Sequence, residues 1–263
     1  MKKILTYILL LSLAACTMPG SDDGKSVYMA SIEPLQRVLG ELAGNDAATE
    51  CLMPQGANPE AFEPGMEQMK ALSGAKVFFT AGTLPFESVM AEKQPSLTIV
   101  AMADGTPGQD PHIWSSVSGI RAMAAKIAAA LPDNEATRLN AARFNAKLDS
   151  VSSIIHSQLD SLKCRDFLVW HPSLTYFAQE YGLHQIAFEQ HGKETSAHDL
   201  KARIDAARQS SAKVFFVEKE FDSRLIDPII EELGVKKVEI NLMGQNFIDE
   251  LVSVAKALHD NDK

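Results

Sequence analysis

The chain has 263 residues, of which 46% are hydrophobic, so it is long enough for two modest domains or one large one. It carries 34 acidic against 25 basic residues, a net charge of −9, which argues against nucleic acid or an anionic lipid surface as a partner. Its three cysteines form no Cys-x-x-Cys pair, which excludes a zinc cage built from thiolates.

The first residues predict a targeting segment and not part of the fold. Two lysines precede an apolar run at residues 4–13, which is too short to span a membrane comfortably. The stretch Leu13-Ala14-Ala15-Cys16 resembles a bacterial lipobox. This resemblance implies cleavage of a signal peptide, residues 1–15, and lipidation of Cys16; the alternative is an ordinary signal peptide with an incidental cysteine. Residues 16–25 are rich in small and polar residues and predict a tether.

Apolar runs then alternate with helical patterns. The expected strands span residues 27–32, 48–53, 76–82 and 96–102. The expected helices span residues 35–43, 66–72 and 120–131. This alternation predicts a mostly parallel sheet flanked by helices.

A long apolar stripe follows at helical spacing. Its members are Phe144, Leu148, Val151, Ile155, Leu159 and Leu162. Pro132 ends the preceding helix, and Asp133 can cap the next one. Since residues 134–163 contain no glycine or proline, one helix of about 40 Å could join two lobes. The stripe alone is equally compatible with a packed core helix or a coiled-coil partner.

The alternation resumes in the last third of the chain. Strands are expected at residues 167–171, 184–188, 213–218 and 236–241. Helices are expected at residues 174–181, 197–210, 225–233 and 247–258. We therefore predict two α/β lobes, residues 26–132 and 164–263, joined by a backbone helix at residues 133–163.

The two remaining cysteines fall in different predicted lobes. Cys51 lies in an early strand, and Cys164 lies just before a late one. This placement favours two separate buried thiols over a disulfide, although an oxidising compartment would permit a disulfide.

Four polar residues fall at or beyond the carboxyl ends of predicted strands, where open α/β sheets bind ligands. They are Glu60, His112, His171 and Asn241. The two histidines come from different lobes. Two imidazoles and one carboxylate are a donor set that suits zinc, manganese or ferrous iron. We therefore expect one divalent metal ion between the lobes.

Several motifs, in their order and spacing, resemble the zinc- and manganese-binding solute-binding proteins of ABC transporters, which have a single helical backbone between two lobes. They are Asn58-Pro59-Glu60 with Phe62-Glu63-Pro64, Asp110-Pro111-His112-Ile113-Trp114, His171 with Tyr176-Phe177, Lys193-Glu194-Thr195-Ser196, and Phe215-Phe216-Val217-Glu218 with Ile240-Asn241 and Gly244. The resemblance covers essentially the whole mature chain. It implies a monomer, lipid-anchored on the extracytoplasmic side of a bacterial membrane, that captures zinc, or else manganese or iron, and delivers it to a permease in the inner membrane.

Two positions depart from that family's pattern. The family usually has histidine where this chain has Glu60, and an acidic residue where it has Asn241. A carboxylate can still bind the ion, but the neutral amide of Asn241 is a poor zinc ligand. Other side chains that could complete the coordination by position are Glu218, Glu189 and His191. Asp110 is expected to orient His112 and not to contact the metal.

Two other functions are alternatives to metal transport. The departures at Glu60 and Asn241 would suit a protein of the same fold with altered or lost metal specificity, acting as a binding or adhesion protein. A zinc hydrolase is less favoured, because the chain lacks a His-Glu-x-x-His helix, a Gly-x-Ser-x-Gly turn and a glycine-rich phosphate loop. No catalytic residue is predicted, and we do not expect an enzyme.

Overall fold

The computed structural model describes residues 27–103, 110–189, 196–221 and 223–262. The predicted signal peptide, the tether and the lipidation at Cys16 lie outside these residues, as does the candidate ligand His191. Within the described ranges, no helix is both long enough and apolar enough to cross a membrane.

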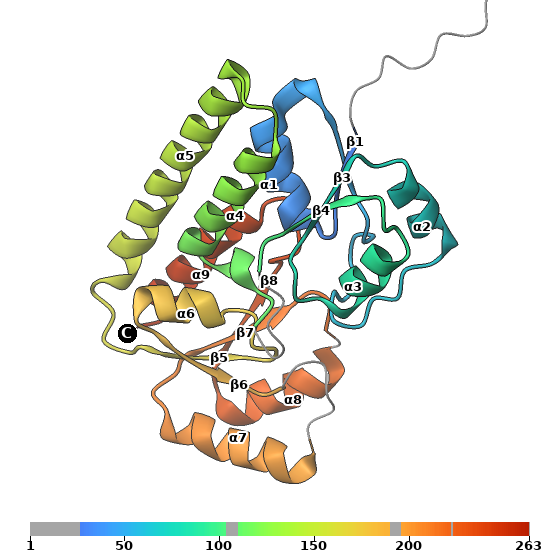
Figure 1. Ribbon diagram of the computed structural model, residues 1–263. Coiled ribbons are helices and arrows are strands. Elements are labelled where there is room, and N and C mark those ends of the chain that lie inside the picture. The colour runs from blue at the N-terminus through green and yellow to red at the C-terminus, as the bar shows by residue number, and fades with distance from the viewer. Residues whose placement is uncertain (1–26, 104–109, 190–195, 222, 263) are drawn as a thin grey trace, which may run out of the picture.

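Two parallel four-stranded sheets form the framework (Figure 1). The first has the order β2-β1-β3-β4, with strands β1 (Val27–Ala30), β2 (Ala48–Cys51), β3 (Val77–Thr80) and β4 (Thr98–Ala101). The second has the order β6-β5-β7-β8, with strands β5 (Asp166–Val169), β6 (His184–Ala187), β7 (Val214–Glu218) and β8 (Lys236–Ile240). Strands β3 and β7 are buried along their whole length, as expected for inner strands covered on both faces. The predicted two-lobe α/β fold with parallel sheets is confirmed.

Helices cover both faces of each sheet (Figure 1). Beside the first sheet lie α1 (Glu33–Ala43), α2 (Met66–Ser73), α3 (Pro85–Glu92) and α4 (Val117–Ala130), with the short turns η1 (Gly44–Asp46) and η2 (Ile113–Ser115). Beside the second lie α6 (Thr175–Tyr181), α7 (Ala197–Gln209), α8 (Ser223–Leu233) and α9 (Phe247–Asp260). Helices α1 and α4 flank the first sheet on one side, with α2 and α3 on the other.

Helix α3 was not expected from the sequence. It begins with Pro85 at its first turn, a position that proline favours. The buried carboxylate of Glu87 accepts backbone N–H groups from Ala81, Gly82 and Leu84. The helix is therefore held by a side chain that binds the turn leading into it.

The predicted long helix is α5 (Glu135–Leu159), and it packs against α1, α4 and α9 (Figure 1). It thus contacts both lobes. Two details of the prediction were wrong. The cap is Asn134, whose side chain accepts the N–H of Thr137, and not Asp133. The helix also ends before residue 163, because the N–H groups of Lys163 and Cys164 are bound by the carboxylate of Asp262. The exact lobe boundaries stay a prediction.

The two cysteines are unpaired, as the sequence favoured, but both are half-buried and not fully buried. Burial raises the pKa of the Cys51 thiol to about 12, and the nearby Glu33 adds to the rise. A thiol with such a pKa is protonated at neutral pH and is a weak nucleophile.

The apolar stripe of α5 should carry much of the stability that joins the lobes. Leu148 is fully buried, so Leu148→Ala should lower the free energy of unfolding by about 2–5 kcal/mol in urea titrations. Leu139 lies on the same helix with 49% of its surface exposed, and Leu139→Ala is the matched control, with an expected change of about 0.5 kcal/mol or less. Equal losses for the two variants would contradict this role of the stripe.

Candidate metal centre

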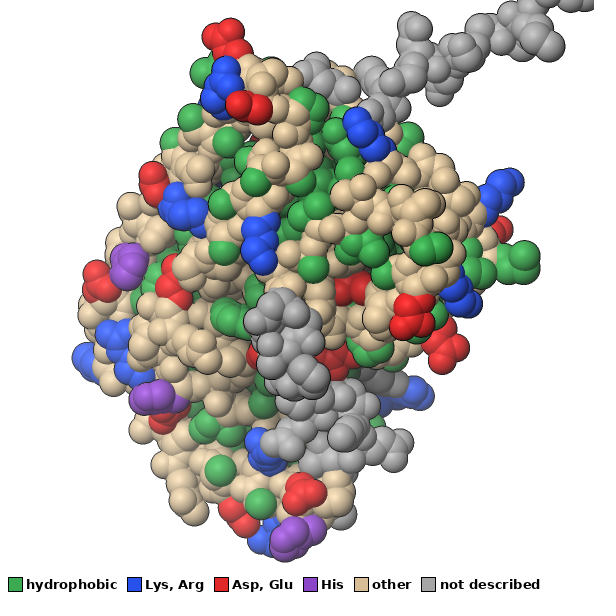
Figure 2. Space-filling view, in the orientation of Figure 1, with side chains coloured by type: hydrophobic (Ala, Val, Ile, Leu, Met, Phe, Trp, Pro, Cys, Tyr) green, Lys and Arg blue, Asp and Glu red, His purple; other side chains and the backbone are tan. Residues whose placement is uncertain are grey.

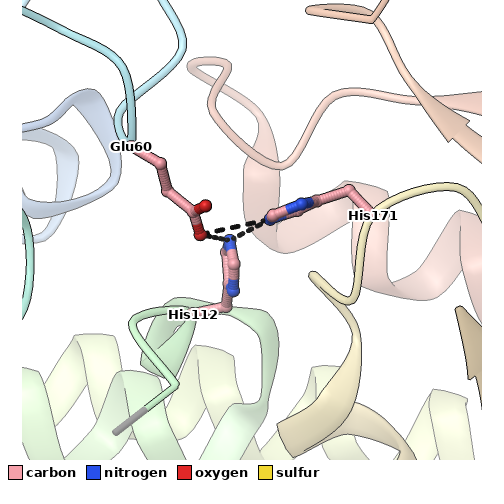
Figure 3. A group of neighbouring side chains, drawn as sticks. All are labelled: Glu60, His112 and His171. Carbon is pink, nitrogen blue, oxygen red and sulfur yellow. Dashed lines mark hydrogen bonds and ion pairs between the residues drawn. The ribbon is translucent and has the colours of Figure 1, made fainter. Parts of the chain in front are cut away.

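Three side chains from separate loops meet between the two lobes (Figure 3). Glu60 lies in the loop after β2, His112 in the loop after β4, and His171 directly after β5. The two Nε2 atoms of the histidines are 3.2 Å apart. An oxygen of Glu60, Oε1, lies 3.4 Å from Nε2 of His171 and 4.0 Å from Nε2 of His112. The three positions predicted at strand ends therefore form one cluster.

The spacing of these atoms fits a single metal ion. Zinc binds imidazole nitrogen and carboxylate oxygen at about 2.0–2.2 Å, so tetrahedral ligand atoms lie about 3.3–3.6 Å apart. Two of the three separations, at 3.2 and 3.4 Å, are close to this spacing, and the third, at 4.0 Å, is a few tenths of an ångström longer. The cluster could accept zinc after a small movement of Glu60 towards His112.

A tight turn positions Glu60. The side-chain oxygen of Asn58 accepts the backbone N–H of Glu60, which is typical of an Asx turn. Pro59 between them is buried and restricts the backbone. Phe62 packs edge-on against Phe86 of α3 and anchors the loop to the first lobe. The carboxylate is consequently held inside the cleft, with only 13% of its side chain exposed.

A carboxylate holds each histidine from behind. Asp110 accepts both the backbone N–H of His112, at 2.9 Å, and a hydrogen bond from its Nδ1, at 2.8 Å. Glu189, which follows β6, accepts a hydrogen bond from Nδ1 of His171 at 2.5 Å. A proton kept on Nδ1 leaves Nε2 to bind a metal. These two hydrogen bonds agree with the expected orienting role of Asp110. We assign Glu189, a candidate ligand by position, to the same role, because its oxygen binds the opposite edge of the ring from the cluster.

The same contacts shift two pKa values. Burial alone would lower the pKa of His171, but its hydrogen bonds to Glu189 and Glu60 raise it to about 10. Burial raises the pKa of the Asp110 carboxyl, but its hydrogen bonds and its attraction to His112 outweigh burial and hold it below its ordinary value. Without a metal, His171 is therefore protonated at neutral pH, and an incoming ion must displace that proton.

Glu218 lies beside the cluster. It ends β7 and, with His112 and His171, lines a cavity of about 30 Å³. Its Oε1 accepts a hydrogen bond from the hydroxyl of Ser173, whereas Oε2 is buried and has no hydrogen-bond partner among the described residues. Burial raises the pKa of Glu218 to about 7. A nearby cation would favour the loss of its proton, so Glu218 remains a candidate to complete the coordination.

Asn241 lines a different cavity from the one that the histidines line, and its role as a ligand stays a prediction. It lines a separate cavity of about 360 Å³, together with Gln55, Gly56, Lys219, Glu220, Met243, Gly244 and Gln245. Its carbonyl accepts the N–H of Gly244, and its amide lies so close to that residue that a side chain there would collide with it. Asn241 is absent from the residues that line the smaller cavity with the histidines. Glu220, which sequence reasoning missed, lines both cavities and lies two residues beyond Glu218.

The other histidines of the described chain lie at the surface. His156, His184, His198 and His259 are all exposed. Figure 2 shows histidine side chains scattered singly over one face. Only His112 and His171 are buried among the described histidines, which agrees with the sequence-based choice of these two.

Two polar contacts connect the lobes next to the cluster. The hydroxyl of Tyr176 on α6 donates to the carbonyl of Asp110 at 3.0 Å. Glu180, on the same helix, accepts the backbone N–H and the hydroxyl of Ser118 at the start of α4. The loop that carries His112 is thus attached to the lobe that carries His171.

Comparisons with known proteins give one consistent family. A family model described as zinc-uptake complex component A, periplasmic, matches residues 29–260. Zinc-binding lipoprotein AdcA of Streptococcus pneumoniae is 25% identical, and the match covers 98% of this chain but only 60% of AdcA. The high-affinity zinc uptake system protein ZnuA of Bacillus subtilis is 22% identical, with 95% of this chain and 94% of that protein covered. A crystal structure of ZnuA superposes with a TM-score of 0.83 at 29% identity, covering 91% of this chain and all of that one.

The contact between Glu189 and His171 should matter for metal affinity. Glu189→Gln removes the negative charge behind the ring, which makes Nε2 a weaker donor, and should weaken zinc binding 10–100-fold in a competition titration with a chelator. Glu239→Gln on β8 is the control, because that side chain is 63% exposed. A zinc affinity of Glu189→Gln equal to that of the control would contradict the orienting role.

The raised pKa of His171 predicts that metal uptake is linked to proton release. At pH 7 the metal-free ring is protonated, and a metal needs it neutral, so binding should release about one proton from His171 in addition to the fraction bound to Glu218. Calorimetric titrations with zinc in two buffers of different ionisation enthalpy measure this number directly. Heats that do not depend on the buffer would show that His171 is already neutral before the ion arrives.

Proposed function

Since this chain belongs to the family of periplasmic zinc-uptake components, whose model matches residues 29–260, we propose that it captures a divalent transition metal and delivers it to the permease of an ABC transporter. The metal is the cargo, held between the two lobes. The observation that carries this proposal is the convergence of Glu60, His112 and His171 from both lobes on one point.

We favour zinc as that cargo, with manganese or iron(II) as alternatives. Two imidazoles suit zinc, and the relatives AdcA and ZnuA are named for zinc. The single carboxylate, Glu60, is a harder donor that manganese and iron also accept. Because two neutral imidazoles and one carboxylate leave one positive charge on a divalent ion, water, Glu218 or another anion completes the coordination.

Release of the ion requires the lobes or their loops to move apart. Helix α5 packs on helices of both lobes and should resist wide hinge opening. The ligands lie on loops, so a small shift of the loop that carries His112 or Glu60 would separate the donors. We propose that such a rearrangement, on docking to the permease, hands over the ion.

The same proposal covers location and assembly. The lipobox-like stretch at Cys16 and the description of AdcA as a lipoprotein support a lipid anchor on the extracytoplasmic side of a bacterial membrane. We propose that the protein acts there as a monomer. The family consists of transport components, and we propose no catalytic role for this member.

The proposal is tested by thermal unfolding with and without metal. Zinc should raise the melting temperature of the mature protein, because it binds only the folded state, and His112→Ala or His171→Ala should each abolish that rise. The control is His184→Ala, which removes an exposed histidine from β6. Wild-type protein that shows no rise with zinc, manganese or iron(II) would refute metal capture.

A further inference from the structure

We propose that the larger cavity binds a small carboxylate chelator, of amino-acid or hydroxy-acid type, so that the protein takes up its metal together with this ligand. The inference rests on the proposed function, because the chelator is recognised through the metal that it carries. It names the species that fills the coordination left open by Glu60, His112 and His171.

The first observation is that the two cavities adjoin and differ in size. The smaller one, with the histidines, has a volume of about 30 Å³ and can hold an ion and little else. The larger one has about 360 Å³, which lies within the range of pockets that bind small organic molecules. Glu220 and Met243 line both. A molecule in the larger cavity could therefore reach an ion in the smaller one.

The second observation is the chemistry of the larger cavity. Three residues with amide side chains, Gln55, Asn241 and Gln245, line it together with Lys219, whose charge interacts with that of Glu220. Gln55, Lys219 and Gln245 are exposed, and Asn241 is half-buried, so a ligand in the cavity can reach them. The amide and ammonium groups of these four residues offer several N–H donors, whereas Glu220 supplies the one carboxylate of the lining. Such a lining favours a ligand with carboxylate oxygens, for which an ammonium group is a strong charge-assisted partner.

The net charge of the metal site also favours an anionic carboxylate ligand. A divalent ion on two neutral imidazoles and one carboxylate keeps one positive charge, which an anionic chelator neutralises. The chelator's carboxylate oxygen and its neighbouring amine or hydroxyl would take the open positions on the metal, where water would otherwise bind. At the edge of that ligand the amide of Asn241 can donate a hydrogen bond, whereas an aspartate would repel it. The departure at Asn241 thus agrees with the proposal.

Equilibrium dialysis with labelled probes tests the inference. Wild-type protein is dialysed against zinc alone, against labelled L-histidine or citrate alone, and against zinc with each probe. We expect about one labelled molecule per protein only when zinc is also present. Binding of zinc without retention of either probe would overturn the inference and leave the proposed function standing. Failure to bind zinc under any of these conditions would overturn the proposed function itself.

Variants then locate the chelator. Lys219→Met should weaken retention of the probe roughly tenfold in the presence of zinc, because a charge-assisted hydrogen bond is lost. Lys213→Met is the matched control, since Lys213 is an exposed lysine just before β7, whereas Lys219 comes just after it, and this variant should leave retention unchanged. Asn241→Asp should also weaken retention. Losses no larger than that of the control, for both variants, would overturn the assignment to this cavity.

Discussion

Two buried imidazoles whose Nε2 atoms lie 3.2 Å apart are the constraint on which the rest of the centre depends. Two lone pairs cannot face each other at this distance out of water, so a proton or a cation must lie between them. Glu60 beside them and the carboxylates of Asp110 and Glu189 behind them supply compensating negative charge. The arrangement therefore favours a proton or a cation at its middle, and this preference supports the proposed capture of a metal ion.

The fold brings the two imidazoles together by using the same sheet topology in both lobes. Each lobe orders its strands in the same way, with the second strand of the lobe at one edge and the fourth at the other. Parallel strands direct all their carboxyl ends to one edge of the sheet, and the ligand loops leave from that edge in both lobes. Helix α5 lies against both lobes and fixes how the two edges face each other. No single loop carries the site.

Much of this could be predicted from the sequence, because periodic apolar patterns and residues at strand ends are local signals. Glu60, His112 and His171 were found in this way, and so was the orienting Asp110, which is two residues from its histidine. Helix α3 was missed because it is short and carries no long apolar stripe. The end of α5 depends on Asp262, about a hundred residues further along the chain. Glu189 can bind His171 only because β6 pairs with β5 in the folded sheet. The cavity that Asn241 lines forms only when residues of both lobes come together. Such facts come from tertiary structure.

The hydroxyl of Tyr176 binds the carbonyl of Asp110, the residue that orients His112. The loop carrying His112 cannot withdraw from the second lobe without breaking this bond. Breaking this bond therefore adds to the activation barrier for opening. For an ion held by the proposed donors, the hydrogen bonds that Tyr176 and Glu180 make across the lobes would slow its escape and so lengthen its residence time.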